Sequence, residues 1–332
     1  RTNRTGTMTK KQQTRLAGKL AAAFVLGSGT WMAAGMLTMP AAEASASDNT
    51  VTITDVNKDD AGNTITVNSE GYYIAGHAAE SGTESTASNN KLTFSNDGTI
   101  TTSTFPFRIV AGRVLQNGAA SAVNNTITLN TNAAIAANIF YGGLAFVNGG
   151  YTDKATATGN TLSLEKGTLS GSGVVLTAGS ATGYTAEATG NTLSISGGTA
   201  AGLYALTGGE AISASGGSVS AANNSIKVTG GTLAVAGDIC GGDAESSQTS
   251  SAAITVDASG NAVTLNDADV SYAGTIYGGK AKGNTLAAVT ASTNTVTIQA
   301  GTFKGSSIYG GYGDSGTTDK SDGNTVTITG GT

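Results

Sequence analysis

Few side chains of this sequence are suited to catalysis, and they are widely spaced. The only histidine is His77 and the only cysteine is Cys240, so the chain lacks the residues of an ordinary zinc site and of an internal disulfide. A thiol becomes reactive beside a cationic group, and Cys240 has no His or Lys close to it in sequence. We therefore expect no metal, no cofactor and no catalytic role for either residue.

Paired carboxylates could supply a second chemistry, because polysaccharide-degrading enzymes use two acidic residues as acid and base. Two groups stand out, Asp267 with Asp269 on one face of an expected strand, and Asp314 with Asp319 and Asp322 in an expected loop. About one repeat before the first pair lie Ala234 and Ala236, so no acidic cluster is expected on adjacent coils. The sequence predicts no enzyme, and a polysaccharide lyase or hydrolase is kept as an alternative.

A short phrase that contains tyrosine and glycine recurs and could bind sugars. Its copies are Ile139-Phe140-Tyr141-Gly142-Gly143, Leu203-Tyr204-Ala205, Ile239-Cys240-Gly241-Gly242, Ile276-Tyr277-Gly278-Gly279 and Ile308-Tyr309-Gly310-Gly311, with variants at Tyr73–Gly76 and Ile109–Gly112. Tyr141, Tyr277 and Tyr309 are candidates for an aromatic stack. Exposed rings would form a platform for sugars, whereas packed rings would close a corner of the fold. Packing is favoured, because Cys240 takes the tyrosine position in one copy.

Asparagines mark the start of a second phrase in every repeat. The marks are Asn63, Asn90, Asn125, Asn160, Asn191, Asn224, Asn261, Asn294 and Asn324, at spacings of 27–37 residues. An alternating strand pattern such as Asn294-Thr295-Val296-Thr297-Ile298 follows, and then a turn such as Gly330-Gly331-Thr332. Glycine permits the positive φ of a sharp corner. The recurring asparagines predict an internal ladder of amides, rather than a ligand-binding row, because coil register requires the same residue in each turn.

About nine repeats of this length predict an all-β, parallel β-helix (β-solenoid). Each unit contains a strand, a Gly corner, a short strand and a polar loop, and Ala287–Thr290 indicates a third strand before the asparagine. Units of 27–37 residues cannot bury a face alone, so they must stack. No helical period follows the first segment. The units are too short for propeller blades, and a sandwich would not repeat one phrase so often.

The first 46 residues have the order of a secretory signal peptide. A basic stretch that includes Lys10 and Lys11 precedes the apolar residues 20–39 and the small-residue run 41–46. We expect translation to start at Met8, with 1–7 an upstream artefact, and cleavage after Ala44 or Ala46. A membrane anchor is the alternative. The β-helix repeat region is then 47–332.

The net negative charge of the repeat region argues against nucleic acid as a partner. Six basic residues and one acidic residue precede residue 47, which leaves 11 basic and 21 acidic residues and a formal charge of −10. Such a surface repels phosphate backbones and anionic lipid, so nucleic acid is not an expected partner.

The strand and Gly phrases, together with the long N-terminal signal, resemble the passenger regions of bacterial autotransporters and haemagglutinin-like adhesins of type V secretion. The resemblance covers residues 49–332 as a style of repeat. It implies a secreted or surface-displayed adhesin that binds glycans or surface proteins through variable loops, or a self-associating biofilm protein. It also implies a C-terminal outer-membrane barrel beyond residue 332, since no barrel pattern occurs in this sequence and the chain stops within a unit.

Overall fold

The protein is described by a computed structural model over residues 45–55, 58–59, 72–78, 84–95, 108–116, 118–147, 153–213, 216–246, 254–284, 286–305, 307–314 and 318–332. Residues 1–44, with most of the expected signal peptide, lie outside the described residues, as does Asn63. Throughout the described part every regular element is a strand. It therefore contains no helix that is long and apolar enough to span a membrane.

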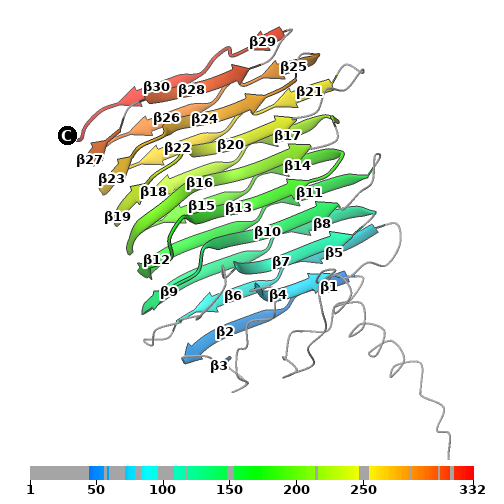
Figure 1. Cartoon of the computed structure of the whole chain (residues 1–332). Helices are drawn as coiled ribbons and strands as arrows, with labels where there is room; N and C mark the ends of the chain where they lie inside the picture. The colour runs from blue at the N-terminus through cyan, green and yellow to red at the C-terminus, as the bar shows by residue number, and fades with distance from the viewer. Residues whose placement is uncertain are drawn as a thin grey trace, which may run out of the picture.

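The strands stack as a parallel β-solenoid, which confirms the predicted fold class (Figure 1). One sheet has nine strands, each from a successive coil, and is called the alanine sheet here. Its strands are β1 (Ser45–Ser47), β5 (Glu84–Ser88), β8 (Ala119–Val123), β11 (Lys154–Thr158), β14 (Thr185–Thr189), β17 (Val219–Ala222), β21 (Ile254–Asp257), β25 (Ala287–Thr290) and β29 (Thr318–Lys320). The expected third strand at Ala287–Thr290 is thus confirmed.

The strands that follow the asparagines belong to a second sheet, which forms the rest of each coil. The strands that follow them are β2 (Thr50–Asp55), β6 (Lys91–Phe94), β9 (Thr126–Ile135), β12 (Thr161–Leu169), β15 (Thr192–Ile195), β18 (Ser225–Val228), β22 (Ala262–Leu265), β26 (Thr295–Ile298) and β30 (Thr325–Ile328). The strands β19 (Thr232–Val235), β23 (Ala268–Tyr272) and β27 (Gly301–Lys304) follow the next corner of their coils. At the corners before Thr199 and Thr232, Gly198 and Gly231 have φ of 84° and 95°, as the phrase predicts.

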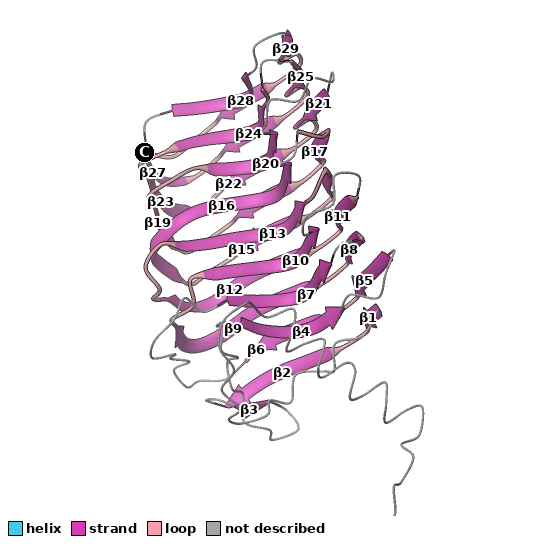
Figure 2. Ribbon diagram, turned by 45° about the vertical axis from the view of Figure 1, so that its right-hand side comes forward, coloured by secondary structure: helices cyan, strands magenta, loops and turns pink. Residues whose placement is uncertain are grey.

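The long strands that carry the tyrosine–glycine phrase complete the coil (Figure 2). They are β4 (Tyr72–Ala78), β7 (Arg108–Gln116), β10 (Ile139–Val147), β13 (Val174–Thr182), β16 (Thr199–Ser213), β20 (Ile239–Ser246), β24 (Thr275–Lys282) and β28 (Ser307–Asp314). β3 (Lys58–Asp59) pairs with β2, and this is the one antiparallel pair among the described strands.

One expected copy of the phrase is out of register. β16 pairs with β20 so that Leu206 and Thr207 lie beside Ile239 and Cys240. The phrase in this coil is therefore Leu206-Thr207-Gly208-Gly209, and Leu203-Tyr204-Ala205 is a wrong assignment. Leu203 instead pairs with Val235 of β19, at an irregularity that leaves Tyr204 outside the core and 60% exposed.

Two cores run along the rod because each long strand bends at its glycines. In β10, Phe140 packs in a core of Leu, Ile, Val and Phe, whereas Ala145 packs in a second core that is mostly alanine. Gly142 and Gly143 lie between them in sequence. The alanine sheet contributes to the second core, where small side chains allow the two layers to approach closely.

Stacking of neighbouring coils buries the alternating residues of each strand. Val296 and Ile298 in β26 are 0% and 3% exposed. Val326 and Ile328, which pair with them from β30, are 44% and 62% exposed. Burial of these positions thus depends on contact with coils on both sides, as expected for units that bury no face alone.

Candidate functional site

The asparagines form a continuous ladder inside the solenoid. In each successive pair of Asn90, Asn125, Asn160, Asn191, Asn224, Asn261, Asn294 and Asn324, the side-chain amide of the first donates to Oδ1 of the second at 2.8–3.1 Å. Asn191 shows the full pattern: its Nδ2 donates to Ala157 O and to Asn224 Oδ1, both at 2.9 Å. Its Oδ1 accepts from the backbone N and from Nδ2 of Asn160, also at 2.9 Å. All four hydrogen bonds that one amide can form are made.

Within the described residues, the first asparagine of the ladder is one that the repeat spacing did not indicate. Asn49 Nδ2 donates to Asn90 Oδ1 at 2.7 Å, and Thr50–Ile53 pairs with Lys91–Phe94. The mark before Asn90 is therefore Asn49, and the choice of Asn63 as that mark is wrong. The two ladder asparagines are 41 residues apart, a longer interval than any between the predicted marks.

A left-handed residue precedes every ladder asparagine and turns the chain into the next strand. The φ angles of these residues are 54–71°. The residues are Asp48, Asn89, Asn124, Gly159, Gly190, Asn223, Gly260, Thr293 and Gly323. Gly, Asn and Asp adopt this conformation most readily, so the recurring Gly-Asn and Asn-Asn pairs are a backbone requirement.

Of the three candidate tyrosines, two form a stack and the third does not. The rings of Tyr277 and Tyr309 stack with centroids 5.6 Å apart and planes 12° apart. Tyr312, which was not predicted to join the stack, has its ring centroid 5.5 Å from that of Tyr277 and 5.8 Å from that of Tyr309. Tyr141 does not join this stack and packs against an outer apolar cluster that includes Leu144. Between Tyr141 and Tyr277 the same outward position is occupied by Thr177, Thr207 and Cys240.

A charged strip on neighbouring coils corrects the expectation that no such cluster exists. It consists of the outward residues that directly follow the second glycine of each phrase and is called the bend strip here. Glu210 lies beside Asp243, and Asp243 beside Lys280, in the parallel register. Ser180 Oγ donates to Glu210 Oε2 at 2.8 Å. The wrong placement of the phrase at Tyr204 concealed Glu210, because alignment on Gly208-Gly209 puts it one coil from Asp243.

Lys280 neutralises part of the bend strip. Its Nζ lies 3.5 Å from Asp243 Oδ2, 3.4 Å from Asp238 Oδ2 and 5.6 Å from the centre of the Tyr277 ring. The Asp243 side chain is 24% exposed, yet its Oδ1 is enclosed and accepts no hydrogen bond from a described residue. Lys280 thus contacts Asp243 within the strip and Tyr277 across the bend.

Burial and like charge shift the pKa values of the strip. Burial raises the pKa of Glu210, the Ser180 hydrogen bond lowers it, and the Asp243 carboxylate raises it further. Burial also raises the pKa of Asp243, and Lys280 offsets part of the effect. For Lys280, burial lowers the pKa but the carboxylate of Asp243 and other neighbours outweigh it, so the net shift is upward. Burial raises the pKa of the Cys240 thiol, which therefore remains protonated and unreactive.

Removal of the Glu210 charge should stabilise the protein at neutral pH. The folded protein holds the Glu210 proton more tightly than the unfolded chain, whose glutamate pKa is about 4.3. Stability therefore falls as pH rises from that value through the folded pKa. We expect Glu210→Gln to unfold at higher urea concentration than wild type at pH 7, and this difference to disappear below about pH 4.

Glu187→Gln is the matched control for this prediction. Glu187 lies on the surface, where its carboxylate is 2.6 Å from Lys154 Nζ. An exposed ion pair contributes about 0–1 kcal/mol, so its removal should leave stability unchanged or slightly lower at pH 7. A Glu210→Gln protein that is less stable than wild type at pH 7 would contradict the predicted cost of the half-buried charge.

The remaining candidates are the other aspartates and His77. Asp267 occupies a corner with φ of 53°, and Asp269 has Thr232 and Thr302 as its neighbours on adjacent coils. Asp322 lies 3.8 Å from Lys320, and His77 lies in β4 in register with Arg113. In the described part of the chain no group of three or more His, Cys, Asp or Glu side chains could hold a metal ion.

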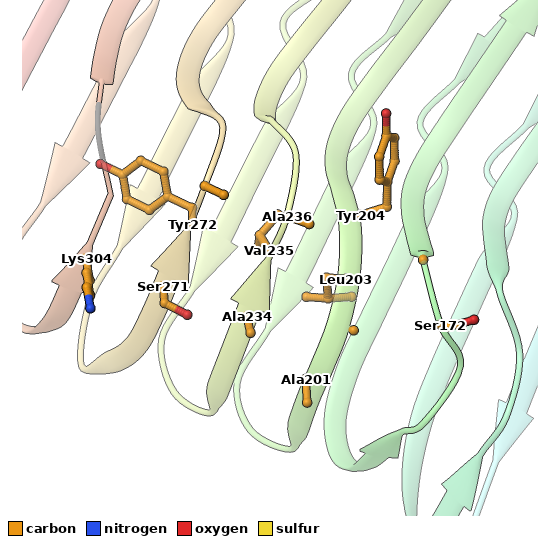
Figure 3. A pocket seen from close by; sticks show the side chains of 13 residues that line it. Ser172, Ala201, Leu203, Tyr204, Ala234, Val235, Ala236, Ser271, Tyr272 and Lys304 are labelled. Carbon is orange, nitrogen blue, oxygen red and sulfur yellow. The ribbon is translucent and has the colours of Figure 1, made fainter.

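A second surface feature lies beside Tyr204, beyond the bend strip. It is a hollow of about 500 Å³ that crosses successive coils. Its lining is mostly apolar, with Ala201, Ala234 and Ala236 in it and Lys304 as its charged residue. Figure 3 shows Tyr204 at one side of these alanines and Tyr272 at the other.

Comparisons of the chain with protein-family models, with curated proteins and with solved structures each found no match. The ladder, the bend strip and the Tyr204 hollow are therefore interpreted from their own geometry and chemistry.

Proposed function

We propose that this protein is a secreted, surface-displayed β-solenoid that acts as an adhesive or structural passenger. The supporting observation is that the interior repeats while the exterior varies. Inside, each coil presents the ladder asparagine and alternating aliphatic residues. Outside, the position after the second glycine changes in every coil from β10 onward, as Leu144, Ser180, Glu210, Asp243, Lys280 and Tyr312.

Such a molecule would bind through repeated weak contacts. A parallel ladder that continues from coil to coil holds outward side chains at fixed spacings of about 4.8 Å. Contacts that are weak singly then add through avidity when many copies are displayed. The expected partners are glycans or proteins of host or bacterial surfaces.

Export by a cleaved signal and a C-terminal outer-membrane barrel belongs to the same proposal. Cleavage after Ala44 would leave β1 whole. Cleavage after Ala46 would remove the carbonyl of Ala46, which accepts a hydrogen bond from Asn90 Nδ2 at 3.0 Å. We therefore favour Ala44 as the last residue of the signal, and N-terminal sequencing of the exported protein tests this choice.

Display of the whole chain on non-adherent bacteria tests the adhesive role. Cells that display it should be retained on epithelial cells or on glycan-coated surfaces, and control cells should wash away. Failure of retention on every surface would reject adhesion. Clumping of the displaying cells in the absence of any surface would instead support the self-associating biofilm role.

A polysaccharide-degrading enzyme is the second candidate, and the bend strip is the observation that favours it. Glu210 and Asp243 lie on adjacent coils, where two carboxyl groups could act as acid and base, and the raised pKa of Glu210 suits the acid. Incubation of the purified protein with polysaccharides separates the two functions. Release of soluble oligosaccharides would support the enzyme, whereas retention without products supports the adhesin.

A further inference from the structure

Tyr204 differs from the other tyrosines on the outer surface. It is 60% exposed, and it follows the irregular point at which β16 leaves the register of its neighbours. Its ring has no aromatic partner in the described part of the chain. Figure 3 shows the ring standing up from β16, nearly edge-on to the viewer, so that its faces point along the row of coils. One ring face thus points toward the coil of Ala236, where a Cβ added to Gly237 would lie 3.9 Å from Tyr204 Cζ.

Small side chains line the floor of the hollow beside Tyr204. Ala234 and Ala236 lie in the coil between Tyr204 and Tyr272, so the two tyrosines are two coil steps, or about 10 Å, apart. Tyr272 does not project into this space. Its ring is 9% exposed and covers the backbone of Gly305, where an added Cβ would overlap it. Methyl groups and backbone therefore form the floor, with the exposed ring of Tyr204 as one wall.

Polar groups lie at the margin of the hollow. Ser172 and Ser271 contribute hydroxyls, and Lys304 contributes the single charged group of the lining. No carboxylate lines the hollow. An apolar floor with an aromatic wall and peripheral hydrogen-bonding groups is complementary to a sugar, whose C–H face is apolar and whose edge carries hydroxyls.

The direction of the hollow indicates a chain rather than a single sugar. It crosses the coils that contain Ser172, Ala201, Ala234, Ser271 and Lys304, so it runs about 19 Å along the rod. The step between coils is close to the length of one sugar residue in an extended chain. A polyanion would meet one lysine on a region with formal charge −10, so an uncharged chain is the better complement.

We infer that the Tyr204 hollow binds an extended neutral polysaccharide, with a sugar face against Tyr204 above Ala236 and hydroxyls near Ser271 and Lys304. The inference rests on the adhesive function proposed above and assigns its ligand class and one binding site. The bend strip is not part of this site.

Affinity electrophoresis of the whole chain in gels with xylan, β-glucan, mannan or polygalacturonate tests the inference. Wild type should be retarded by at least one neutral polysaccharide and not by polygalacturonate. Tyr204→Ala should weaken that binding about tenfold, the equivalent of 1.4 kcal/mol. Lys304→Ala should weaken it roughly threefold, because the hydrogen bond from the ammonium group is lost. Tyr309→Ala, which removes a 44% exposed ring from the other tyrosine group, is the control and should bind as wild type.

Retardation by polygalacturonate alone, by none of the four, or equal losses for Tyr204→Ala and Tyr309→Ala would overturn the inference. Adherence of cells that display the same variants is measured in parallel. If displaying cells adhere but no neutral polysaccharide retards the protein, the hollow is not the adhesive binding site and the adhesive function stands. If the protein binds a neutral polysaccharide through Tyr204 but the cells do not adhere, the hollow is correct and the adhesive function fails.

Discussion

Asn191→Leu should lower the free energy of unfolding by on the order of 4 kcal/mol, because each buried polar group left without a partner costs about 1–3 kcal/mol. Leucine has nearly the shape of asparagine, so it keeps water out of the position. Asn160 N and Ala157 O lose the hydrogen bond that Asn191 gives them. Asn224 Oδ1 and Asn160 Nδ2 each lose one of two hydrogen bonds and keep the one to Asn191 N and to Ala122 O. Asn191 itself is 0% exposed. Urea denaturation followed by circular dichroism measures the loss.

Amide hydrogen exchange gives a local readout of the same change. The backbone N–H of Asn160 donates to Asn191 Oδ1 rather than to another strand, so its protection should fall most. Asn130→Leu is the control, since Asn130 is exposed and donates to Glu165 Oε2 at 2.9 Å. It should change stability by less than about 1 kcal/mol. Similar losses for the two variants, or unchanged protection at Asn160, would show that the ladder contributes no more than a surface hydrogen bond.

Much of the fold could be predicted from the sequence because its rules are local. Alternation of Thr and Val or Ile in Asn294–Ile298 specifies a half-buried strand without reference to any other coil. Recurrence of that pattern specifies stacking, since one coil has no core. The asparagine ladder follows from the same recurrence. These features lie inside the rod, where every coil meets the same neighbours.

The wrong register assignments arose in coils whose length or outer sequence differs from that of the other coils. A 41-residue interval made Asn63 a better match to the period than Asn49. The tyrosine of Leu203-Tyr204-Ala205 matched the phrase by residue type, although Thr207 holds that position in the register. The pairing of coils is fixed by hydrogen bonds and by the glycines, and side chains on the outer face are free to vary. Residue type on that face is therefore a poor guide to register.

The acidic pair was missed for the same reason. Glu210 and Asp243 are 33 residues apart, and they become neighbours only when Gly209 is placed beside Gly242. The glycines are the better register mark, because the position is glycine in each coil of the described long strands. These residues are Gly76, Gly112, Gly143, Gly179, Gly209, Gly242, Gly279 and Gly311. The preceding position tolerates Ala75, Ala111 and Ala178 in place of glycine.

Contact with the ladder, rather than backbone conformation, explains the requirement for the second glycine. None of these residues has a positive φ. A Cβ added to Gly179 would overlap Oδ1 and Cγ of Asn191, and each of the other second glycines lies against the ladder asparagine of its own coil in the same way. Asn191 cannot move aside, because its amide is held by four hydrogen bonds.

Gly179→Ala should therefore destabilise the protein by about 3 kcal/mol, at the upper end of the usual cost of overpacking. Gly173→Ala is the control. Gly173 has φ of 67° and nothing within 4 Å of an added Cβ, so only the backbone cost of about 1 kcal/mol applies. Urea denaturation of both variants measures the difference. If Gly173→Ala were as harmful as Gly179→Ala, flexibility of glycine rather than contact with Asn191 would be the cause.

A double-mutant cycle tests the contact itself. Asn191→Ala removes the side chain that the new methyl group at position 179 would strike, so Gly179→Ala should cost much less in that background than in wild type. The coupling between the two substitutions is expected to exceed about 1 kcal/mol, as for residues in direct contact. Strict additivity would mean that the two residues act independently. Strong coupling would show that glycine and asparagine form one unit, which repeats in every coil and fixes the register on which the outer residues are displayed.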